Sequence, residues 1–483
     1  MEWSELSHLS QEEIQEVQNQ KIKHLMRYEA PFSPYYRELF KKHNINFKDI
    51  QTTDDLAKIP FTTKTDLAPT QEDPAKPRQF ILQPDEKLLK KHSSPGRLAG
   101  LIVKKLTGQD PKPKLEWEYK PIHIHFTTGR TALPTPFAYS ARDIETLKES
   151  AKRMFNVIGI PNDIVAINAF PYAPHLAFWL AFFGLTTVGL TSLQTGGGKI
   201  SGTQKILDGL ERMKGGLLLG IPGYIYHLLR TARKEGRNLE NLKYIIFGGE
   251  RASPGLRDKV KELCKEMGTK DLQIFVTYAF TEGKTAWIQC HESEGYHIYP
   301  DIGYFEVVDK EGKRVPDGHP GELVYTALDW RGTIVIRYKT GDMTQGIEYG
   351  PCVHCGRTVP RILPDLQRSS EFKEFRLTKV KGELVNLNQF FPLLSGMSEI
   401  EEWQLEIKKK DNDPYGLDEL VLYICPKQGQ DFDSIKEMVA RKIHNEIMVN
   451  VDMVQRPLDQ LLQQLGMETE LKEKRIIDNR PKE

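Results

Sequence analysis

The sequence predicts an α/β fold built on an open sheet of parallel strands. Three short apolar runs lead to this prediction, because a polar cluster follows each of them. The runs are residues 242–247, 272–276 and 333–337, and the clusters are 248–250, 277–282 and 338–342. Open α/β sheets bind their ligands beyond the carboxyl ends of their strands. The three clusters therefore predict a binding site along one edge of a sheet.

Earlier in the chain, a loop of hydroxyl groups surrounds a glycine at residues 127–135, directly after a strand-like run at 121–126. The loop reads Thr-Thr-Gly-Arg-Thr-Ala-Leu-Pro-Thr. Hydroxyl and backbone N–H groups in such a loop can donate hydrogen bonds to phosphate oxygens. Taken alone, the same composition is equally typical of an ordinary turn. The interpretation of this loop therefore depends on its neighbours.

The next predicted strand, residues 164–167, leads into an aromatic run at 168–175. We expect this run and residues 220–224 to line a pocket for a small, largely apolar ligand. The most apolar segment of the chain follows at 176–185. It is shorter than the roughly 20 residues that cross a bilayer, so it predicts a core helix and no membrane span.

The polar clusters have distinct chemical uses. Gly248 and Gly249 lack side chains, so a flat base can approach their backbone. Glu282 offers a carboxylate that could hold Mg²⁺ on phosphates. Asp342 offers two acceptor oxygens, which suits the two hydroxyls of a ribose. Together these residues predict a nucleotide site.

This ordered set of motifs resembles the adenylate-forming enzymes, the superfamily of acyl-CoA synthetases, adenylation domains and luciferases. The runs at 35–40, 54–67 and 355–362 are typical of its phenylacetate-CoA ligase branch, so the resemblance covers nearly the whole chain. It implies a large multi-sheet α/β domain at residues 1–366, which holds the ATP and acyl sites. It also implies a small, mobile α+β domain at 367–483, whose strands would include 420–424.

The resemblance assigns the nucleotide contacts. The family pattern SSGTTGKPT falls on 127–135, where Arg130, Ala132 and Leu133 depart from it, and the pattern YGxTE falls on 278–282 with Ala279 in place of glycine. Arg368 is the best match to the family's hinge segment. The residues so assigned to ATP or AMP are Thr127, Thr128, Gly129, Thr131, Gly248, Gly249, Glu250, Tyr278, Ala279, Thr281, Asp342 and Arg368.

The same resemblance places the catalytic lysine at Lys472, although Leu471 replaces the glycine that precedes it in the family. It implies that a carboxylate attacks the α-phosphate of ATP, which yields an acyl-adenylate and pyrophosphate, and that coenzyme A then takes the acyl group. Lys472 would bridge the carboxylate and the α-phosphate, while Glu282 holds Mg²⁺. The alternative interpretation of Lys472 is a solvated lysine in a charged tail.

The expected substrate is a small aromatic or short-chain carboxylic acid, and the expected product is its coenzyme A thioester. Two alternatives stay open. An acyl-adenylating enzyme could transfer its acyl group to an amine or to the thiol of a carrier protein. A non-catalytic nucleotide-binding protein is favoured by the departures at Arg130, Ala132 and Ala279.

The cysteines make a separate case. Cys352 and Cys355 form a Cys-x-x-Cys knuckle, and a structural zinc needs four ligands. Some relatives in the phenylacetate-CoA ligase branch complete such a site with a cysteine and a histidine from an earlier segment. The resemblance therefore implies a structural Zn²⁺ at Cys290, His297, Cys352 and Cys355, with His291 or His354 as substitutes. The alternative is a set of reduced side chains in loops.

The overall charge is balanced, with 67 basic and 66 acidic residues, so nothing points to a nucleic-acid partner. Five cysteines and the absence of a basic, apolar start predict a cytoplasmic protein. A basic insertion at about 75–120 holds eleven Lys or Arg against five Asp or Glu. It is either a solvated surface segment or a surface for coenzyme A phosphates or a protein partner. A homodimer is left open.

Overall fold

The computed structural model describes residues 1–127, 134–292, 294–364, 366–368, 378–380, 383–385, 387–409, 418–447, 449–466 and 473–480. The chain forms two compact units. The first unit comprises Met1–Asp163, Ala173–Leu190 and Thr277–Leu366, and the second comprises Ile164–Tyr172, Thr191–Val276 and Gln367–Glu483. A boundary between units thus falls at residue 366, and the division into domains 1–366 and 367–483 stays a prediction.

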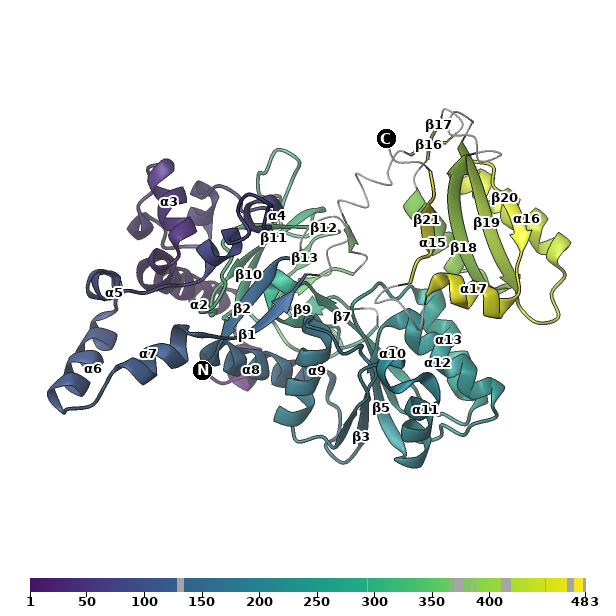
Figure 1. Cartoon of the computed structure of the whole chain (residues 1–483), viewed down its shortest axis with the longest axis horizontal. Helices are drawn as coiled ribbons and strands as arrows, with labels where there is room; N and C mark the ends of the chain where they lie inside the picture. The colour runs from purple at the N-terminus through teal and green to yellow at the C-terminus, as the bar shows by residue number, and fades with distance from the viewer. Residues whose placement is uncertain are drawn as a thin grey trace. The chain divides into compact units, whose positions relative to one another are not determined.

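The first unit begins with a helical region and continues into antiparallel strands (Figure 1). Its α-helices are α1 (Trp3–Leu6), α2 (Gln11–His24), α3 (Pro34–Lys42), α4 (Lys64–Leu67), α5 (Glu86–His92), α6 (Pro95–Leu106), α7 (Lys112–Tyr119), α8 (Ala141–Ile158) and α9 (Leu176–Thr187). The shorter helices are η1 (Leu25–Glu29), η2 (Ala30–Phe32), η3 (Phe47–Asp49), η4 (Asp54–Lys58), η5 (Lys76–Phe80) and η6 (Thr281–Gly283).

The strands of the first unit belong to several small sheets. They are β1 (Pro121–Phe126), β2 (Pro136–Ser140), β8 (Ala286–Ile288), β9 (Tyr296–His297), β10 (Gly303–Val308), β11 (Gly321–Ala327), β12 (Tyr338–Thr344), β13 (Ile347–Glu348) and β14 (Arg361–Ile362). Strands β1 and β2 form an antiparallel hairpin around the loop at 127–135. Strands β10, β11 and β12 pair in that order, and β14 lies between β13 and β9.

The second unit contains the open parallel sheet that the sequence predicts. Its elements are β3 (Val165–Asn168), β4 (Ser192–Gln194), α10 (Gly198–Ser201), α11 (Thr203–Arg212), β5 (Gly215–Gly220), α12 (Pro222–Lys234), β6 (Tyr244–Phe247), α13 (Pro254–Glu266) and β7 (Gln273–Ala279). The parallel order is β4-β3-β5-β6-β7. Strand β5 is buried along its whole length, as parallel strands covered on both faces are. The last residues of β7 enter the first unit, where they pair with β8.

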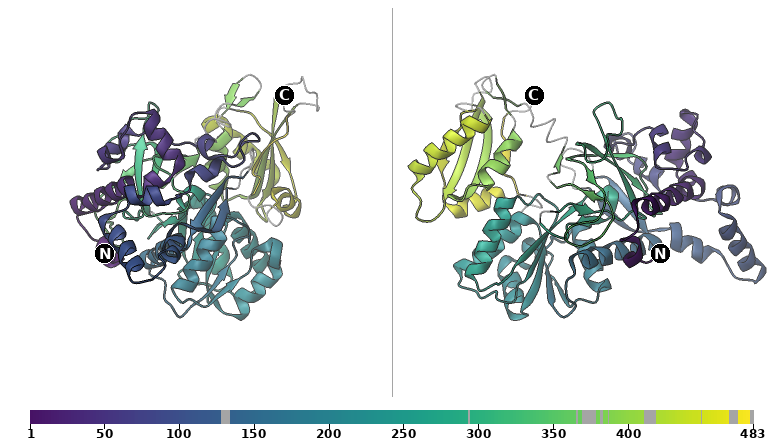
Figure 2. Two further views of the ribbon diagram at one scale, coloured as in Figure 1. Left: turned by 60° about the vertical axis from the view of Figure 1, so that its left-hand side comes forward. Right: turned by 180° about the vertical axis from the view of Figure 1, so that it is seen from behind.

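The C-terminal part of the second unit is an α+β layer around one four-stranded sheet (Figure 2). Its elements are β15 (Gln367–Arg368), β16 (Thr378–Val380), β17 (Glu383–Val385), η7 (Leu387–Gln389), α15 (Phe390–Ser395), β18 (Ile400–Lys409), β19 (Asp418–Pro426), α16 (Phe432–Ile447), β20 (Asp452–Gln455), α17 (Leu458–Leu465) and β21 (Ile476–Asp478). The sheet order is β20-β19-β18-β21. Helices α15 and α16 share one apolar core with this sheet, whereas Leu461 of α17 packs with Val421 and Tyr423.

Most predicted elements are confirmed: the expected runs appear as β1, β3, α9, β6, β7 and β19. The predicted strand at 333–337 is wrong. The backbone N–H of Ile334 donates to the carbonyl of Phe80, and that of Ile336 donates to the hydroxyl of Tyr36. This apolar run is therefore buried against N-terminal segments, and the polar cluster predicted beyond its end itself forms strand β12 of an antiparallel sheet.

Within the described part of the chain, no helix combines the length and the apolar character needed to cross a bilayer.

Candidate nucleotide and metal sites

The two predicted carboxylates lie in the first unit and are held by reciprocal hydrogen bonds. Tyr278, near the end of β7, donates from its hydroxyl to Oδ2 of Asp342 at 2.8 Å. Tyr338, at the start of β12, donates from its hydroxyl to Oε1 of Glu282 at 2.8 Å. Each segment thus carries a tyrosine and, four residues later, an acid, and each tyrosine binds the acid of the other segment. Both donors are neutral, so these two bonds orient the carboxylates without neutralising them.

The backbone around Asp342 is also fixed. Its carboxylate is almost fully buried, and its N–H donates to the hydroxyl of Thr340 at 3.0 Å. That hydroxyl donates in turn to the carbonyl of Leu323 on β11 at 2.9 Å. Gly341 between them has φ of 75°, a conformation that favours glycine. The acid is therefore presented by a rigid turn within a strand.

A buried ion pair that the sequence analysis missed supports the turn that carries Glu282. Lys284 has left-handed backbone geometry with φ of 59°, and its Nζ lies 3.0 Å from Oδ2 of Asp143. The same ammonium donates to the carbonyl of Ala138 on β2 at 2.8 Å. Burial lowers the pKa of Lys284, and the Asp143 carboxylate opposes that change. The pair joins the strand that leaves the 127–135 loop to the Glu282 turn.

Asp143 also caps the N-terminus of α8, and the sequence contains the signature of this cap. It forms a capping box with Ser140 at the start of α8, and its other contacts are the N–H groups of Arg331 and Gly332. A serine followed three residues later by an acid is the sequence signature of such a cap. The partner Lys284 has no comparable signature, because the pair spans 141 residues.

The 127–135 loop is closed at its base by two hydrogen bonds. Thr127 N donates to Thr135 O at 3.1 Å, and Thr135 N donates to Thr127 Oγ1 at 3.0 Å. The remaining predicted loop residues, Thr128, Gly129 and Thr131, lie outside the described residues, and so does Lys472. Arg368 lies in β15.

The predicted base-binding motif belongs to the second unit, where it follows β6. Gly248 donates from its N–H to the carbonyl of Gly220 at 3.2 Å. Gly249 has φ of 83°, which an L residue rarely adopts. Glu250 comes next. The two glycines therefore allow a turn at the carboxyl end of this strand, as the sequence predicts.

The strand before the loop carries a histidine cluster that the sequence analysis did not consider. The two Nε2 atoms of His123 and His125 are 2.8 Å apart, and His125 Nδ1 lies 2.9 Å from the hydroxyl of Tyr139. Burial lowers the pKa of His125 to about 3. The alternation of Ile and His along β1 was the available signal, because it sends both imidazoles to one face.

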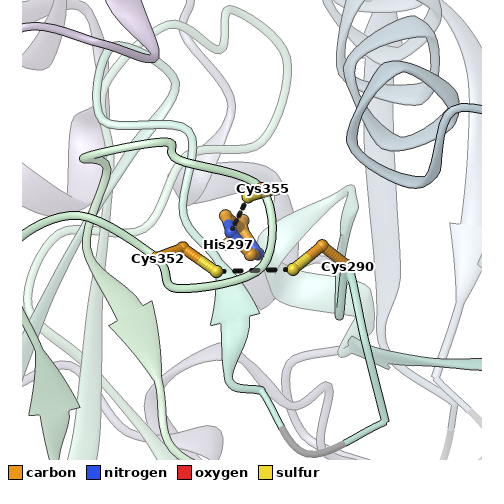
Figure 3. Close-up of side chains that lie close together, drawn as sticks. All are labelled: Cys290, His297, Cys352 and Cys355. Carbon is orange, nitrogen blue, oxygen red and sulfur yellow. Dashed lines mark hydrogen bonds between the residues drawn. The ribbon is translucent and has the colours of Figure 1, made fainter.

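The predicted metal ligands converge (Figure 3). Cys290, His297, Cys352 and Cys355 offer ligand atoms that all lie within 4.8 Å of one another. Sulfur atoms around a tetrahedral zinc, with Zn–S bonds near 2.3 Å, lie about 3.8 Å apart. Here the Cys290 and Cys352 sulfurs are 3.5 Å apart, and Cys355 Sγ lies 3.2 Å from His297 Nε2. Three thiols and one imidazole at these separations fit a structural Zn²⁺.

The protonation of this cluster is uneven. A hydrogen bond from the Cys290 thiol holds the pKa of Cys355 well below its usual range, and the same bond raises the pKa of Cys290. Burial opposes protonation of His297, yet its contacts with Cys352 and Cys355 raise its pKa. A bound metal would favour thiolates at all three cysteines, because deprotonated sulfur is the ligand.

A second ring of residues surrounds the four ligands. The Cys352 thiol lies 3.6 Å from Oε2 of Glu294, which also pairs with Arg361 at 3.6 Å and with His354 at 3.5 Å. His354 stacks on His291 with ring centroids 4.0 Å apart. The two substitutes considered for the site thus lie beside the four ligands. Such outer contacts orient metal ligands and tune their basicity.

Two tyrosine rings in tilted contact connect the metal cluster with the nucleotide carboxylates. Tyr296 precedes His297 on β9, and its ring lies 5.9 Å from that of Tyr278, measured between centroids. Tyr278 is the residue that donates to Asp342. The strand that supplies a metal ligand therefore also packs against a residue that positions the acid.

An α/β body with an open parallel sheet, paired carboxylates and a small α+β C-terminal layer is the architecture of an adenylate-forming enzyme. The chain belongs to the AMP-binding enzyme family, whose model matches residues 42–327. The resemblance on which the sequence analysis relied is thus confirmed.

Several proteins of known function are similar to this chain. A phenylacetate-coenzyme A ligase of Thermus thermophilus is 25% identical over 469 residues, which cover 94% of each chain. Another, of Aromatoleum evansii, is 27% identical over 380 residues, which cover 77% of this chain and 71% of the relative.

Among solved structures, a 2-hydroxyisobutyryl-CoA ligase in its postadenylation state matches with a TM-score of 0.78 and 21% identity, over 99% of this chain and 92% of the other. The same ligase was also solved in a thioesterification state and in an open conformation. The predicted α/β fold is therefore confirmed, and the mobility of the C-terminal domain stays a prediction.

Proposed function

We propose that the protein uses ATP to activate a small aromatic or short-chain carboxylic acid as an acyl-adenylate and then transfers the acyl group to coenzyme A. One observation carries the proposal: the reciprocal bonds of Tyr278 and Tyr338, which fix Asp342 and Glu282 relative to each other. The related phenylacetate-coenzyme A ligases and the fold shared with 2-hydroxyisobutyryl-CoA ligase support the reaction class. The precise acid differs among these relatives.

The roles of the two acids follow from their chemistry. Asp342 would accept hydrogen bonds from the two ribose hydroxyls, while Glu282 would hold Mg²⁺ against the phosphates. Magnesium would supply charge neutralisation for the attack on the α-phosphate. The loop at 127–135 would bind phosphate oxygens, and Gly248, Gly249 and Glu250 would contact the base.

In the first half-reaction, the substrate carboxylate forms a bond to the α-phosphorus, and the bond to pyrophosphate breaks. Two anions approach each other in this step, so catalysis depends on positioning and on positive charge. Lys472 would provide that charge as a flexible ammonium. In the second half-reaction, the thiol of coenzyme A forms the thioester, and AMP leaves with the bonding electron pair of its acyl–oxygen bond.

The Cys/His cluster is proposed to bind one structural zinc ion. All four side chains then serve as ligands, so no coordination position remains for a substrate, and the ion does not take part in either half-reaction. Elemental analysis of the purified protein should give about one zinc per chain, and Cys352→Ser should remove it. A metal-free wild-type protein of unchanged stability would contradict this assignment.

Adenylation is tested by acid-dependent exchange of labelled pyrophosphate into ATP, over a panel of aryl, arylacetic and short hydroxy acids. Exchange should occur with at least one acid and should be lost in Glu282→Gln and Lys472→Ala. Lys474→Ala is the matched control, because it removes a neighbouring lysine that the proposal leaves out of the site. A folded protein that binds ATP but exchanges with no acid would favour the non-catalytic alternative.

The acceptor needs a separate assay. With the activating acid identified, coenzyme A should stimulate AMP release and yield a thioester detected by mass spectrometry. Hydroxylamine serves as the control, because it traps an acyl-adenylate whether or not coenzyme A is the acceptor. Trapping without any thioester would point to an amine or a carrier-protein thiol.

A further inference from the structure

Two of the rings that pack around Tyr278 belong to the segment that supplies two of the metal ligands. Tyr278 lies opposite Trp287 in the antiparallel pairing of β7 with β8, and their ring centroids are 5.8 Å apart. The ring of Tyr278 also lies 5.9 Å from that of Tyr296. Cys290 follows Trp287 by only a few residues, and His297 directly follows Tyr296. Any movement of these two ligands is therefore transmitted to the rings beside Tyr278.

The other two ligands lie on the chain that continues from Asp342. Strand β12 contains Asp342 and is followed by β13, and the knuckle of Cys352 and Cys355 comes next. The hydroxyl of Tyr278 donates to Asp342 at 2.8 Å. The donor and the acceptor of this bond are thus each connected to one of the two segments that the four ligands would join.

The region between the two segments contains very short strands. Strands β9, β13 and β14 have two residues each, whereas strands usually have about three to ten. A single isolated bridge between Gln289 and Tyr296 closes the loop that begins at Cys290. In the knuckle, the side chain of Val353 is 86% exposed. Strands this short add few ladder hydrogen bonds, so an ion held by all four ligands would supply most of the cross-linking.

The second carboxylate of the nucleotide site is supported from elsewhere. Tyr338, which donates to Glu282, forms a parallel bridge with Thr62. The backbone N–H of Thr62 donates to the carbonyl of Arg337 at 3.0 Å. This support comes from the N-terminal part of the chain and not from the segments that the ligands would join. A loose metal cluster should therefore disturb Asp342 more than Glu282.

From these contacts we infer that the Cys/His cluster is coupled to the ribose end of the nucleotide site. Trp287 and Tyr296 are positioning residues in this coupling, because they hold the ring whose hydroxyl orients Asp342. Binding of an ion and binding of a nucleotide then strengthen each other by the same factor, since coupling between two sites is reciprocal. The inference rests on the proposed role of Asp342 as the acceptor of the ribose hydroxyls.

The first test measures the ribose contribution in the zinc-loaded, full-length protein, with AMP and 2′,3′-dideoxyAMP as ligands. The two nucleotides carry the same base and phosphate, so the ratio of their dissociation constants isolates the ribose hydroxyls. Calorimetry measures both constants. Tyr296→Ala should reduce the preference for AMP by about 5-fold or more, which is the usual range for coupled sites, while elemental analysis still finds zinc. Tyr296→Phe keeps the ring and should keep the preference of the wild type.

Tyr299→Ala is the matched control, because it removes a buried ring that packs on Trp3 and not on Tyr278. It should lower stability without changing the preference for AMP. An unchanged preference in Tyr296→Ala, or an equal loss in Tyr299→Ala, would overturn the inference. A wild type that binds both nucleotides equally would refute the role of Asp342 itself, and the inference would fall with it. The wild type thus separates a failure of the proposed function from a failure of the coupling alone.

The second test measures the coupling in the opposite direction and needs no variant. Saturating AMP should raise the zinc affinity of the wild type by about 5-fold or more, measured by competition with a chromophoric chelator. The dideoxy nucleotide should raise it less, and it also controls for zinc that binds the phosphate in solution. Equal effects of the two nucleotides, or no effect of either, would overturn the inference.

Discussion

Two polar clusters in the first unit, one fully buried and one partly buried, differ in what satisfies their polar groups. Asp143 and Lys284 carry opposite charges, and the backbone groups around them supply the remaining hydrogen bonds. Cys290, His297, Cys352 and Cys355 instead gather four groups that all offer an electron pair to the same point. The first cluster satisfies itself and belongs to the fold, whereas the second needs an ion. A cluster whose donors and acceptors satisfy one another is thus structural, whereas a cluster made of ligand groups alone is a candidate binding site.

The largest expected effect is the loss of one member of the self-paired cluster. Lys284→Met leaves the buried Asp143 carboxylate without its cation, which should lower the free energy of unfolding by about 3 to 5 kcal/mol. Urea unfolding followed by circular dichroism measures this change. The double variant Lys284→Met/Asp143→Asn removes both charges and should recover part of the loss. If Lys284→Met were as stable as the wild type, the Asp143–Lys284 pair would not be a structural pair, and the contrast with the metal cluster would be wrong.

A second self-paired cluster predicts how stability depends on pH. Burial alone would raise the pKa of Glu29, but the guanidiniums of Arg331 and Arg97 and the contacts from His24 and Tyr119 lower it from 4.5 to about 2. A carboxyl whose pKa is lower in the folded state stabilises the fold above its unfolded pKa. That contribution, about 3 kcal/mol, is lost as the pH falls from about 4.5 through about 2.

Glu29→Gln should therefore lower the free energy of unfolding at pH 7 and flatten its decline between about pH 4.5 and about pH 2. Urea unfolding at a series of pH values measures both effects. Glu145→Gln is the matched control, because it removes an acid that is half exposed and paired only at the surface. Equal pH slopes in Glu29→Gln and the wild type would show that this cluster does not carry the effect.

The metal cluster should respond to a residue that touches a ligand without being one. Glu294→Ala removes the acid beside the Cys352 thiol and should weaken zinc binding about 10- to 100-fold. Competition with a chromophoric chelator measures the affinity. Glu348→Ala is the control, because Glu348 also pairs with Arg361 but is half exposed and is not one of the four ligands. Equal affinities of the two variants would remove Glu294 from the site.

The smallest effect is expected at the surface of the helix that carries Asp143. Lys148 pairs with Glu145 on α8 at 2.9 Å, and both side chains are substantially exposed. Lys148→Ala should change the free energy of unfolding by less than about 0.5 kcal/mol, because water screens such pairs. The same urea titration measures it. A loss as large as that of Lys284→Met would mean that burial is not what separates the two pairs.

Local patterns predicted most of the sheet elements, and the family resemblance named the four Cys and His residues that the structure brings together. The runs that became β6 and β7 are short, apolar and followed by polar residues, and the Cys-x-x-Cys spacing is characteristic in itself. The Glu282 and Asp342 motifs could be located, but their tyrosine partners could not. A hydrogen bond between residues 64 apart leaves no local signal. The prediction of a strand at 333–337 was wrong because an apolar composition indicates burial but not the hydrogen-bond partners of the backbone. Here the backbone N–H of Ile336 donates to a side-chain hydroxyl and not to a neighbouring strand.

The crossed bonds of Tyr278 and Tyr338 also constrain how the chain is made. The two hydrogen bonds join residues that are 64 and 56 positions apart in the sequence. Neither bond can form before the segment with Tyr338 and Asp342 has left the ribosome. Each segment supplies both a donor and an acceptor, and a one-residue slip in the pairing of β12 would turn Tyr338 and Asp342 away together. Both hydrogen bonds therefore form only after β12 has been synthesised.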